Sequence, residues 1–125
     1  MATTIETPQR MAEVLGAFSA AVDRHDVDAI MAVMTDDCVF ENSGPAPDGE
    51  RAEGQGAVRA VWERLFHATP TGKFEREEVI VTGDRAVTRW KATWDGGHVR
   101  GIDLFRVRDG KIAEKLSYMK GLLPE

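Results

Sequence analysis

The sequence lacks the features that mark several large protein classes. Cys38 is its single cysteine, so no disulfide can form within the chain. No apolar run approaches the roughly 20 residues that a membrane-spanning helix needs. Residues 1–10 carry no apolar signal segment. We therefore expect a cytoplasmic protein with no membrane partner.

The chain also lacks an excess of positive charge. Its formal net charge is −5, which does not favour binding to the phosphate backbone of nucleic acids. The histidines at positions 25, 67 and 98 do not have the spacing of metal ligands. There is no glycine-rich phosphate loop and no serine-nucleophile motif. We expect no nucleic-acid partner, no metal and no cofactor.

The composition is that of one ordinary globular domain. The chain has 125 residues, of which 42% are hydrophobic and 30% are charged, so a core of useful size can be buried. We expect a single domain over residues 1–125, with residues 1–6 frayed.

Apolar residues at helical spacing predict three helices in the first half of the chain. Thr7 is the expected N-cap of the first helix, with Pro8 at its first position, and Asp26 is the expected N-cap of the second. The predicted helices cover 7–25, 27–34 and a segment that ends before Pro70, and a short strand over 38–43 is followed by a long glycine- and proline-rich loop at 44–56.

The second half predicts an antiparallel meander. Its segments are separated by the turn signals GD, DGG and DG, and they cover residues 73–83, 85–95, 98–108 and 111–121. Helices followed by a run of strands indicate an α+β fold.

One carboxylate interrupts an apolar face of the third strand in this meander. Asp103 alternates with valine, glycine and phenylalanine residues on one side of segment 98–108. A buried carboxylate is unfavourable unless it is paired or protonated. Asp103 is therefore the candidate acid/base group, and a structural ion pair with Lys115 is the alternative.

The turn at 108–111 decides which residues of the last strand share the face of Asp103. A two-residue loop would place Glu114, Leu116 and Tyr118 there. A three-residue turn with Gly110 left-handed would place Lys115 opposite Asp103 and would add Ala113, Ser117 and Met119 to that face. The pattern alone does not choose between them.

Two segments, RHDVDAIMAVMTDDCVFEN and GIDLFRVRDGKIAEKLSYMKG, resemble the nuclear transport factor 2 superfamily, and most closely its SnoaL-like branch of polyketide cyclases and uncharacterised relatives. The resemblance covers about residues 8–121. It implies a cone-shaped fold in which three N-terminal helices pack on a strongly curved, mostly antiparallel mixed sheet. Ligands would enter the open end of the cone.

The ketosteroid isomerases of this superfamily carry an aspartic acid in the sequence IDHFRF, which resembles GIDLFRV around Asp103. Their tyrosine on the first helix corresponds to Phe18, and their catalytic base corresponds to Asn42. Steroid isomerisation by their mechanism is therefore not expected.

Limonene epoxide hydrolases are similar in another way. Their water-binding asparagine matches Asn42, and their tyrosine on the same strand corresponds to Phe40. Their arginine and two aspartic acids fall near Trp90, Ala92 and Ser117, so that machinery is absent as well. Both comparisons favour the three-residue turn.

Two classes of function remain. The first is an enzyme of isomerase, cyclase, lyase or hydrolase type acting on an apolar carbonyl- or hydroxyl-bearing ligand, with Asp103 as acid/base and Asn42 as polar positioner. The second is a non-catalytic binding protein for an apolar metabolite. In either case the expected ligand-binding residues are Phe18, Phe40, Trp62, Phe66, Trp90, Trp94, Phe105, Lys115, Ser117 and Met119.

If these residues face a cavity, large apolar residues on the last two strands must face away from it. No helix remains to cover that outer surface, and soluble monomers rarely expose such a patch. We expect a homodimer through this face, as is common in the superfamily, formed by Ile102, Leu104, Ile112, Leu116 and Tyr118.

Overall fold

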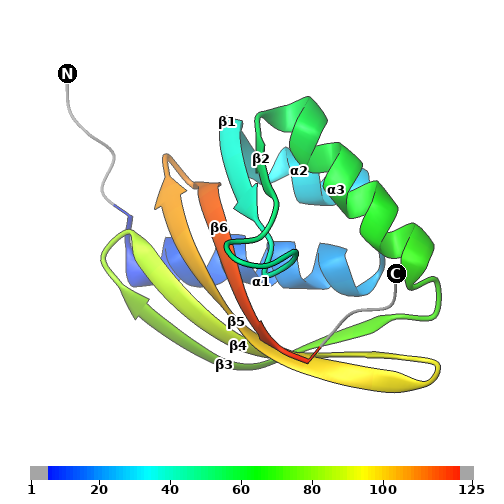
Figure 1. Cartoon of the computed structure of the whole chain (residues 1–125). Helices are drawn as coiled ribbons and strands as arrows, with labels where there is room; N and C mark the ends of the chain where they lie inside the picture. Colours follow the sequence, from blue (N-terminus) through cyan, green and yellow to red (C-terminus); the bar gives the residue numbers. More distant parts are fainter. Residues whose placement is uncertain (1–5, 122–125) are drawn as a thin grey trace.

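A computed structural model describes residues 6–121 of the chain and confirms the α+β fold of helices on a curved mixed sheet (Figure 1). The elements are α1 (Pro8–Asp23), α2 (Val27–Ala32), β1 (Met34–Glu41), β2 (Arg51–Glu53), α3 (Gln55–Ala68), β3 (Lys73–Thr82), β4 (Arg85–Trp94), β5 (Gly97–Arg108) and β6 (Lys111–Lys120). Residues 1–5 of the segment expected to fray lie outside the described residues. Glu6 differs from that expectation, because it is buried and its Oε1 accepts a hydrogen bond from the backbone N–H of Gly110.

The two predicted helix caps are present. The side chain of Thr7 accepts a hydrogen bond from the backbone N–H of Arg10 at 3.0 Å, and Asp26 accepts one from Ala29 at 3.0 Å. The second helix is shorter than expected, because α2 ends at Ala32 and the chain enters β1 at Met34. The long loop is also partly ordered into β2, a strand of three residues that the sequence analysis missed.

The sheet has the strand order β2-β1-β6-β5-β4-β3. Neighbouring strands are antiparallel except for the parallel pair of β1 and β6. Figure 1 shows the long strands bending around the helices, which lie on the concave side of the sheet. The apolar faces of α1 and α3 meet the inner face of the sheet there and form the main core.

The turn between β5 and β6 combines both of the alternatives that the sequence leaves open. The loop itself has two residues, Asp109 and Gly110, both with positive φ, and it joins the paired residues Arg108 and Lys111. Further along, Val107 pairs with Ile112 whereas Arg106 pairs with Glu114. Ala113 is thus an extra residue, a β-bulge that shifts β6 by one position.

The bulge produces the face that a three-residue turn was expected to produce. Ser117 now lies opposite Asp103, whereas the prediction placed Lys115 there; Lys115 instead pairs with Phe105. The prediction that Ile112 faces outward is wrong. Ile112 precedes the bulge, so it shares the inner face with Val107 and is fully buried in the core.

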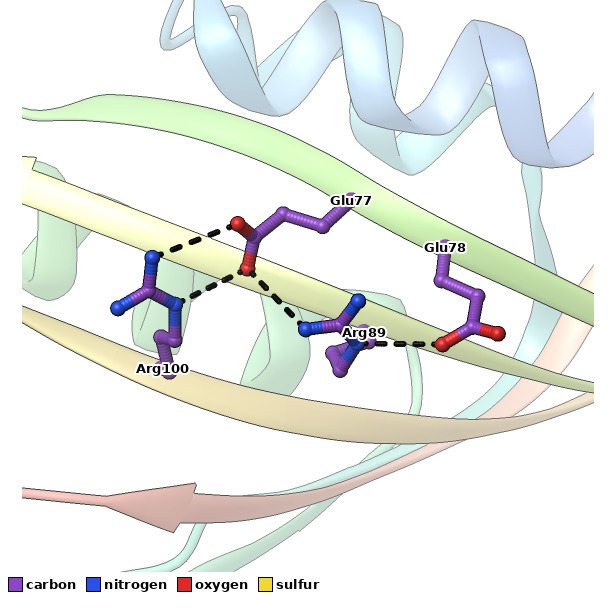
Figure 2. Close-up of polar contacts among 4 residues, drawn as sticks. All are labelled: Glu77, Glu78, Arg89 and Arg100. Atoms are coloured by element: carbon purple, nitrogen blue, oxygen red, sulfur yellow. Dashed lines mark hydrogen bonds and ion pairs between the residues drawn. The ribbon is translucent and has the colours of Figure 1, made fainter.

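The outer face of the sheet is mixed. Ion pairs join three strands on it, because Glu77 on β3 contacts Arg89 on β4 and Arg100 on β5, and Arg89 also contacts Glu78 (Figure 2). Beside this network an apolar row crosses four paired strands: Ile80, Val87, Leu104 and Leu116. Ile102 and Tyr118 lie next to the row and are 43% and 61% exposed.

Candidate functional site

An open cavity lies between the helices and the concave face of the sheet. The empty space within it, counted together with the open solvent at its mouth, is about 750 Å³. Its walls come from α1, α3, the end of β1 and the four strands of the meander, and they are mostly apolar. The predicted residues that line it are Phe18, Phe40, Asn42, Trp62, Phe66, Trp90, Trp94, Asp103, Lys115, Ser117 and Met119.

The predicted site residue Phe105 does not line this cavity. It lies on the inner face of β5 and is 1% exposed, with its ring 5.4 Å from that of Phe18 in an edge-to-face contact. Phe105 therefore supports the cavity wall as a core residue.

A chain of three polar side chains crosses the apolar wall of the cavity. Lys115 Nζ donates a hydrogen bond to Ser117 Oγ at 2.7 Å, and Ser117 Oγ donates one to Asp103 Oδ1 at 2.7 Å. The distance between Lys115 Nζ and Asp103 Oδ1 is 3.4 Å, so the two end groups also form an ion pair. We call these three residues the Lys–Ser–Asp relay.

The two end groups of the relay are almost completely withdrawn from solvent. The side chains of Lys115 and Asp103 are 6% and 2% exposed. Burial lowers the pKa of the Lys115 ammonium below its ordinary value of 10.5, and the nearby Asp103 carboxylate opposes that shift. The amine is thus easier to deprotonate than an exposed lysine.

Aromatic rings enclose the charged end of the relay. Lys115 Nζ lies 4.1 Å from the ring centre of Phe40 and 5.4 Å from that of Trp62, both favourable cation–π positions. Trp62 also contacts Phe18, Phe40 and Phe66 at centroid distances of 5.8, 4.9 and 5.6 Å. Much of the wall is therefore one packed aromatic cluster.

Two indole groups on the cavity wall have unused hydrogen-bonding capacity. The Nε1 atoms of Trp62 and Trp90 are buried, and neither meets an acceptor among residues 6–121. Buried donors in folded proteins nearly always have a partner. A ligand oxygen in the cavity would be one candidate partner for such a donor.

The end of β1 brings the amide of Asn42 to the cavity. Its backbone N–H donates to the Glu50 carbonyl at 2.8 Å, and the next residue, Ser43, donates through Oγ to the Ser117 carbonyl at 2.9 Å. These bonds tie the end of β1 to the neighbouring loop and to β6. Asn42 is half-buried and lines the cavity with Asp103, although β1, which it directly follows, and β5 are not adjacent strands.

Sequence reasoning missed several residues of the wall, and His25 is the most informative of them. In the structure its Nε2 hydrogen-bonds the Gly72 carbonyl oxygen at 2.9 Å, and its ring stacks on Phe66 at 4.2 Å. His25 adopts a positive φ of 57° just beyond α1, and no sequence pattern signals that conformation. The other missed lining residues are Val22, Ser43, Leu65, Thr69, Gly72, Lys73, Phe74, Ala92 and Thr93.

Residues 6–121 contain neither a metal-binding cluster nor a membrane-spanning helix. Nowhere in residues 6–121 do three histidine, cysteine, aspartate or glutamate side chains gather closely enough to hold a metal ion. None of the helices in that range is long and apolar enough to cross a membrane. Cys38 is fully buried, and burial raises the pKa of its thiol, which makes it a poor nucleophile.

Comparisons with known proteins agree with this architecture. The sequence profile of the SnoaL-like domain matches residues 15–115. The chain is 38% identical to an NTF2-like protein of unknown function from Mesorhizobium loti, over 93% of this chain and 95% of that one, with a TM-score of 0.82. No curated protein matches the sequence.

More distant structures share the fold. A candidate polyketide cyclase from Sinorhizobium meliloti is 26% identical over 88% of this chain and 99% of its own, with a TM-score of 0.75. A candidate ketosteroid isomerase from Kribbella flavida is 12% identical, covers 94% of this chain and 82% of its own, and has a TM-score of 0.78. At 12% identity the likeness extends to the fold alone.

Proposed function

Because the chain belongs to the SnoaL-like domain family, we propose that it is a small-molecule enzyme that acts on an apolar ligand carrying a carbonyl or hydroxyl group. The reaction class is a proton transfer beside a carbonyl, as an isomerase, cyclase or lyase carries out. The observation that carries this proposal is the Lys–Ser–Asp relay in the wall of an otherwise apolar cavity.

In this proposal Asp103 takes and returns the proton. Its carboxyl group lines the cavity, which is the position that a general acid or base needs in order to reach a bound ligand. Ser117 holds Oδ1 of Asp103 in a fixed orientation through the 2.7 Å hydrogen bond. Asn42 is the polar positioner of the ligand oxygen, and the free indole N–H groups are further donors for it.

The walls set the class of ligand. They offer flat aromatic surfaces and few charged groups, which suits an apolar compound with one oxygen function and does not suit sugars or nucleotides. The similarity of the chain to the candidate polyketide cyclase from Sinorhizobium meliloti supports this class of ligand.

Solvent-hydrogen exchange tests the proposal without knowledge of the natural substrate. In heavy water the protein is expected to speed the incorporation of deuterium at the carbons beside the carbonyl of 2-tetralone, a flat apolar ketone, as followed by NMR. Asp103→Asn should reduce the rate by about 10²-fold or more, whereas Asp36→Asn, on an exposed position of β1, should not change it. Binding of the ketone with no exchange by the wild type would favour the non-catalytic binding protein.

We also propose that the protein forms a homodimer through the outer face of the sheet. The apolar row of Ile80, Val87, Leu104 and Leu116, with the exposed Ile102 and Tyr118 beside it, is the kind of surface that a second copy covers. The network in Figure 2 carries both acidic and basic groups along this row, so a copy related by a two-fold axis can face acids with bases.

A further inference from the structure

Lys115 differs from every other lysine of the chain in its surroundings. The remaining lysines are exposed or half-buried, whereas Lys115 is 5% exposed and lines the cavity. Its Nζ atom is close to two aromatic rings and to two oxygen atoms, Ser117 Oγ and Asp103 Oδ1. An amine kept apart from bulk water and in contact with a ligand cavity is suited to react with a ligand.

The relay gives this amine a route to its reactive form. In the charged state the ammonium donates to Ser117, and Ser117 donates to the Asp103 carboxylate. If each hydrogen moves to the next atom, the amine and the carboxylic acid are both neutral and every hydrogen bond is kept with its direction reversed. The apolar surroundings favour the neutral pair more than water does, since they stabilise charges poorly.

We propose that Lys115 is a nucleophile that forms an imine with the carbonyl carbon of an apolar aldehyde or ketone. This inference rests on the proposed function and names the carbonyl compound as its ligand class. In the proposed function only Asp103 takes part in the chemical step, and this inference adds a covalent step at Lys115.

The step balances without any further reagent. The lone pair of the Lys115 amine forms the N–C bond while the carbonyl π pair moves to oxygen, which takes a proton from the Asp103 carboxylic acid through Ser117. The carbinolamine, which is positively charged at its nitrogen, then loses its hydroxyl group together with one nitrogen proton as water, and a C=N bond forms. The amine, the carbonyl and the Asp103 carboxylic acid are thus converted to a protonated imine, water and the Asp103 carboxylate, with no oxidation or reduction.

The contacts that hold the ammonium also suit the product. A protonated imine at Nζ keeps its positive charge 3.4 Å from Asp103 Oδ1 and over the ring of Phe40. Such an iminium withdraws electrons from the neighbouring carbon and makes its hydrogens more acidic. The proton that Asp103 is proposed to remove would therefore leave more easily.

Reductive trapping tests this inference. The protein is incubated with 4-isopropylbenzaldehyde and cyanoborohydride at neutral pH, and the modified residue is identified by mass spectrometry of its peptides. We expect one isopropylbenzyl group on Lys115, attached before any exposed lysine reacts, and blocked by an excess of 4-isopropylbenzyl alcohol. Lys115→Arg should lose this label. Lys111→Arg, at an exposed position outside the cavity lining, should keep it.

Calorimetric binding of the alcohol separates failure of the inference from failure of the proposed function. If the alcohol binds but the label is spread evenly over the exposed lysines, the nucleophile is overturned and the apolar carbonyl site stands. If neither the alcohol nor the aldehyde binds, both are overturned. Because the label is mapped in the wild type, these outcomes hold even if Lys115→Arg does not fold.

Discussion

The buried pair of Lys115 and Asp103 makes a quantitative prediction about stability. At 3.4 Å and an effective dielectric constant of about 20, two unit charges attract by about 5 kcal/mol. Lys115→Met removes the cation with little change of shape and leaves the carboxylate buried alone, and Asp103→Asn does the reverse. Removal of one partner of a buried pair costs about 3–5 kcal/mol, and both side chains keep part of their hydrogen bonding through Ser117. We expect each single variant to lose about 3 kcal/mol of unfolding free energy.

The double variant should lose much less than the sum. With both charges gone nothing is left unpaired, so we expect it to lie within about 1 kcal/mol of the wild type. The sum of the single losses, about 6 kcal/mol, less that remainder gives a coupling energy of about 5 kcal/mol, in agreement with the attraction worked from the distance.

The assay is urea unfolding at pH 7, followed by tryptophan fluorescence and circular dichroism for all four proteins. The slope of the unfolding free energy against urea concentration should be the same for all four proteins, since the variants leave the fold unchanged. Additive losses, with the double variant near 6 kcal/mol below the wild type, would refute the coupling of the two charges. Residual structure that is common to the four unfolded proteins cancels in the coupling energy.

Further predictions concern the pH dependence of stability, the contact between Gly101 and Trp90, and the outer face of the sheet. The folded protein holds the pKa of Lys115 below 10.5, so just below that pH the unfolded chain binds more protons than the folded one. The unfolding free energy of the wild type, relative to that of Lys115→Met, should therefore rise as the pH increases toward 10.5. A difference between the two proteins that stays constant across this range, as measured by urea unfolding, would contradict the lowered pKa. Gly101→Ala places a Cβ 2.6 Å from Cζ2 of Trp90 and 2.9 Å from the carbonyl oxygen of Tyr118. We therefore expect the unfolding free energy to fall by about 1–3 kcal/mol and the tryptophan fluorescence to change. Unchanged stability and fluorescence would mean that the Trp90 indole does not pack on Gly101. The proposed dimer should scatter light as a particle of twice 13.8 kDa at micromolar concentration, and Leu104→Glu with Leu116→Glu should give a monomer; a wild-type mass of 13.8 kDa would exclude the dimer.

The sequence predicts the faces of the meander well because alternation is a local property of each strand. Asp103 and Trp90 lie on the inner side, as their spacing from buried neighbours indicates. The strands themselves begin and end within a few residues of their predicted bounds, since glycine and aspartate mark each turn. Family resemblance supplied the curvature and the cavity, which no local pattern encodes.

The relay could be predicted only in part, because it depends on a pairing between two strands. Lys115 was expected near Asp103, but Ser117 was not expected to bridge them. That arrangement follows from the register of β6, which the bulge at Ala113 sets. A bulge leaves no clear mark in a single sequence, and the DG turn is compatible with either register. The wrong prediction that Ile112 faces outward has the same cause.

The extra residue at position 113 has a consequence for how this site can be gained and lost. Because side chains alternate along a strand, a β6 that paired with β5 without the bulge would set Ala113 opposite Arg106 and shift all that follows by one place. Lys115 and Ser117 would then face the outer surface, and Leu116 and Tyr118 would take their places in the cavity. The site is therefore lost or recruited by a slip of one residue between two strands, with Asp103, Ser117 and Lys115 themselves unmutated.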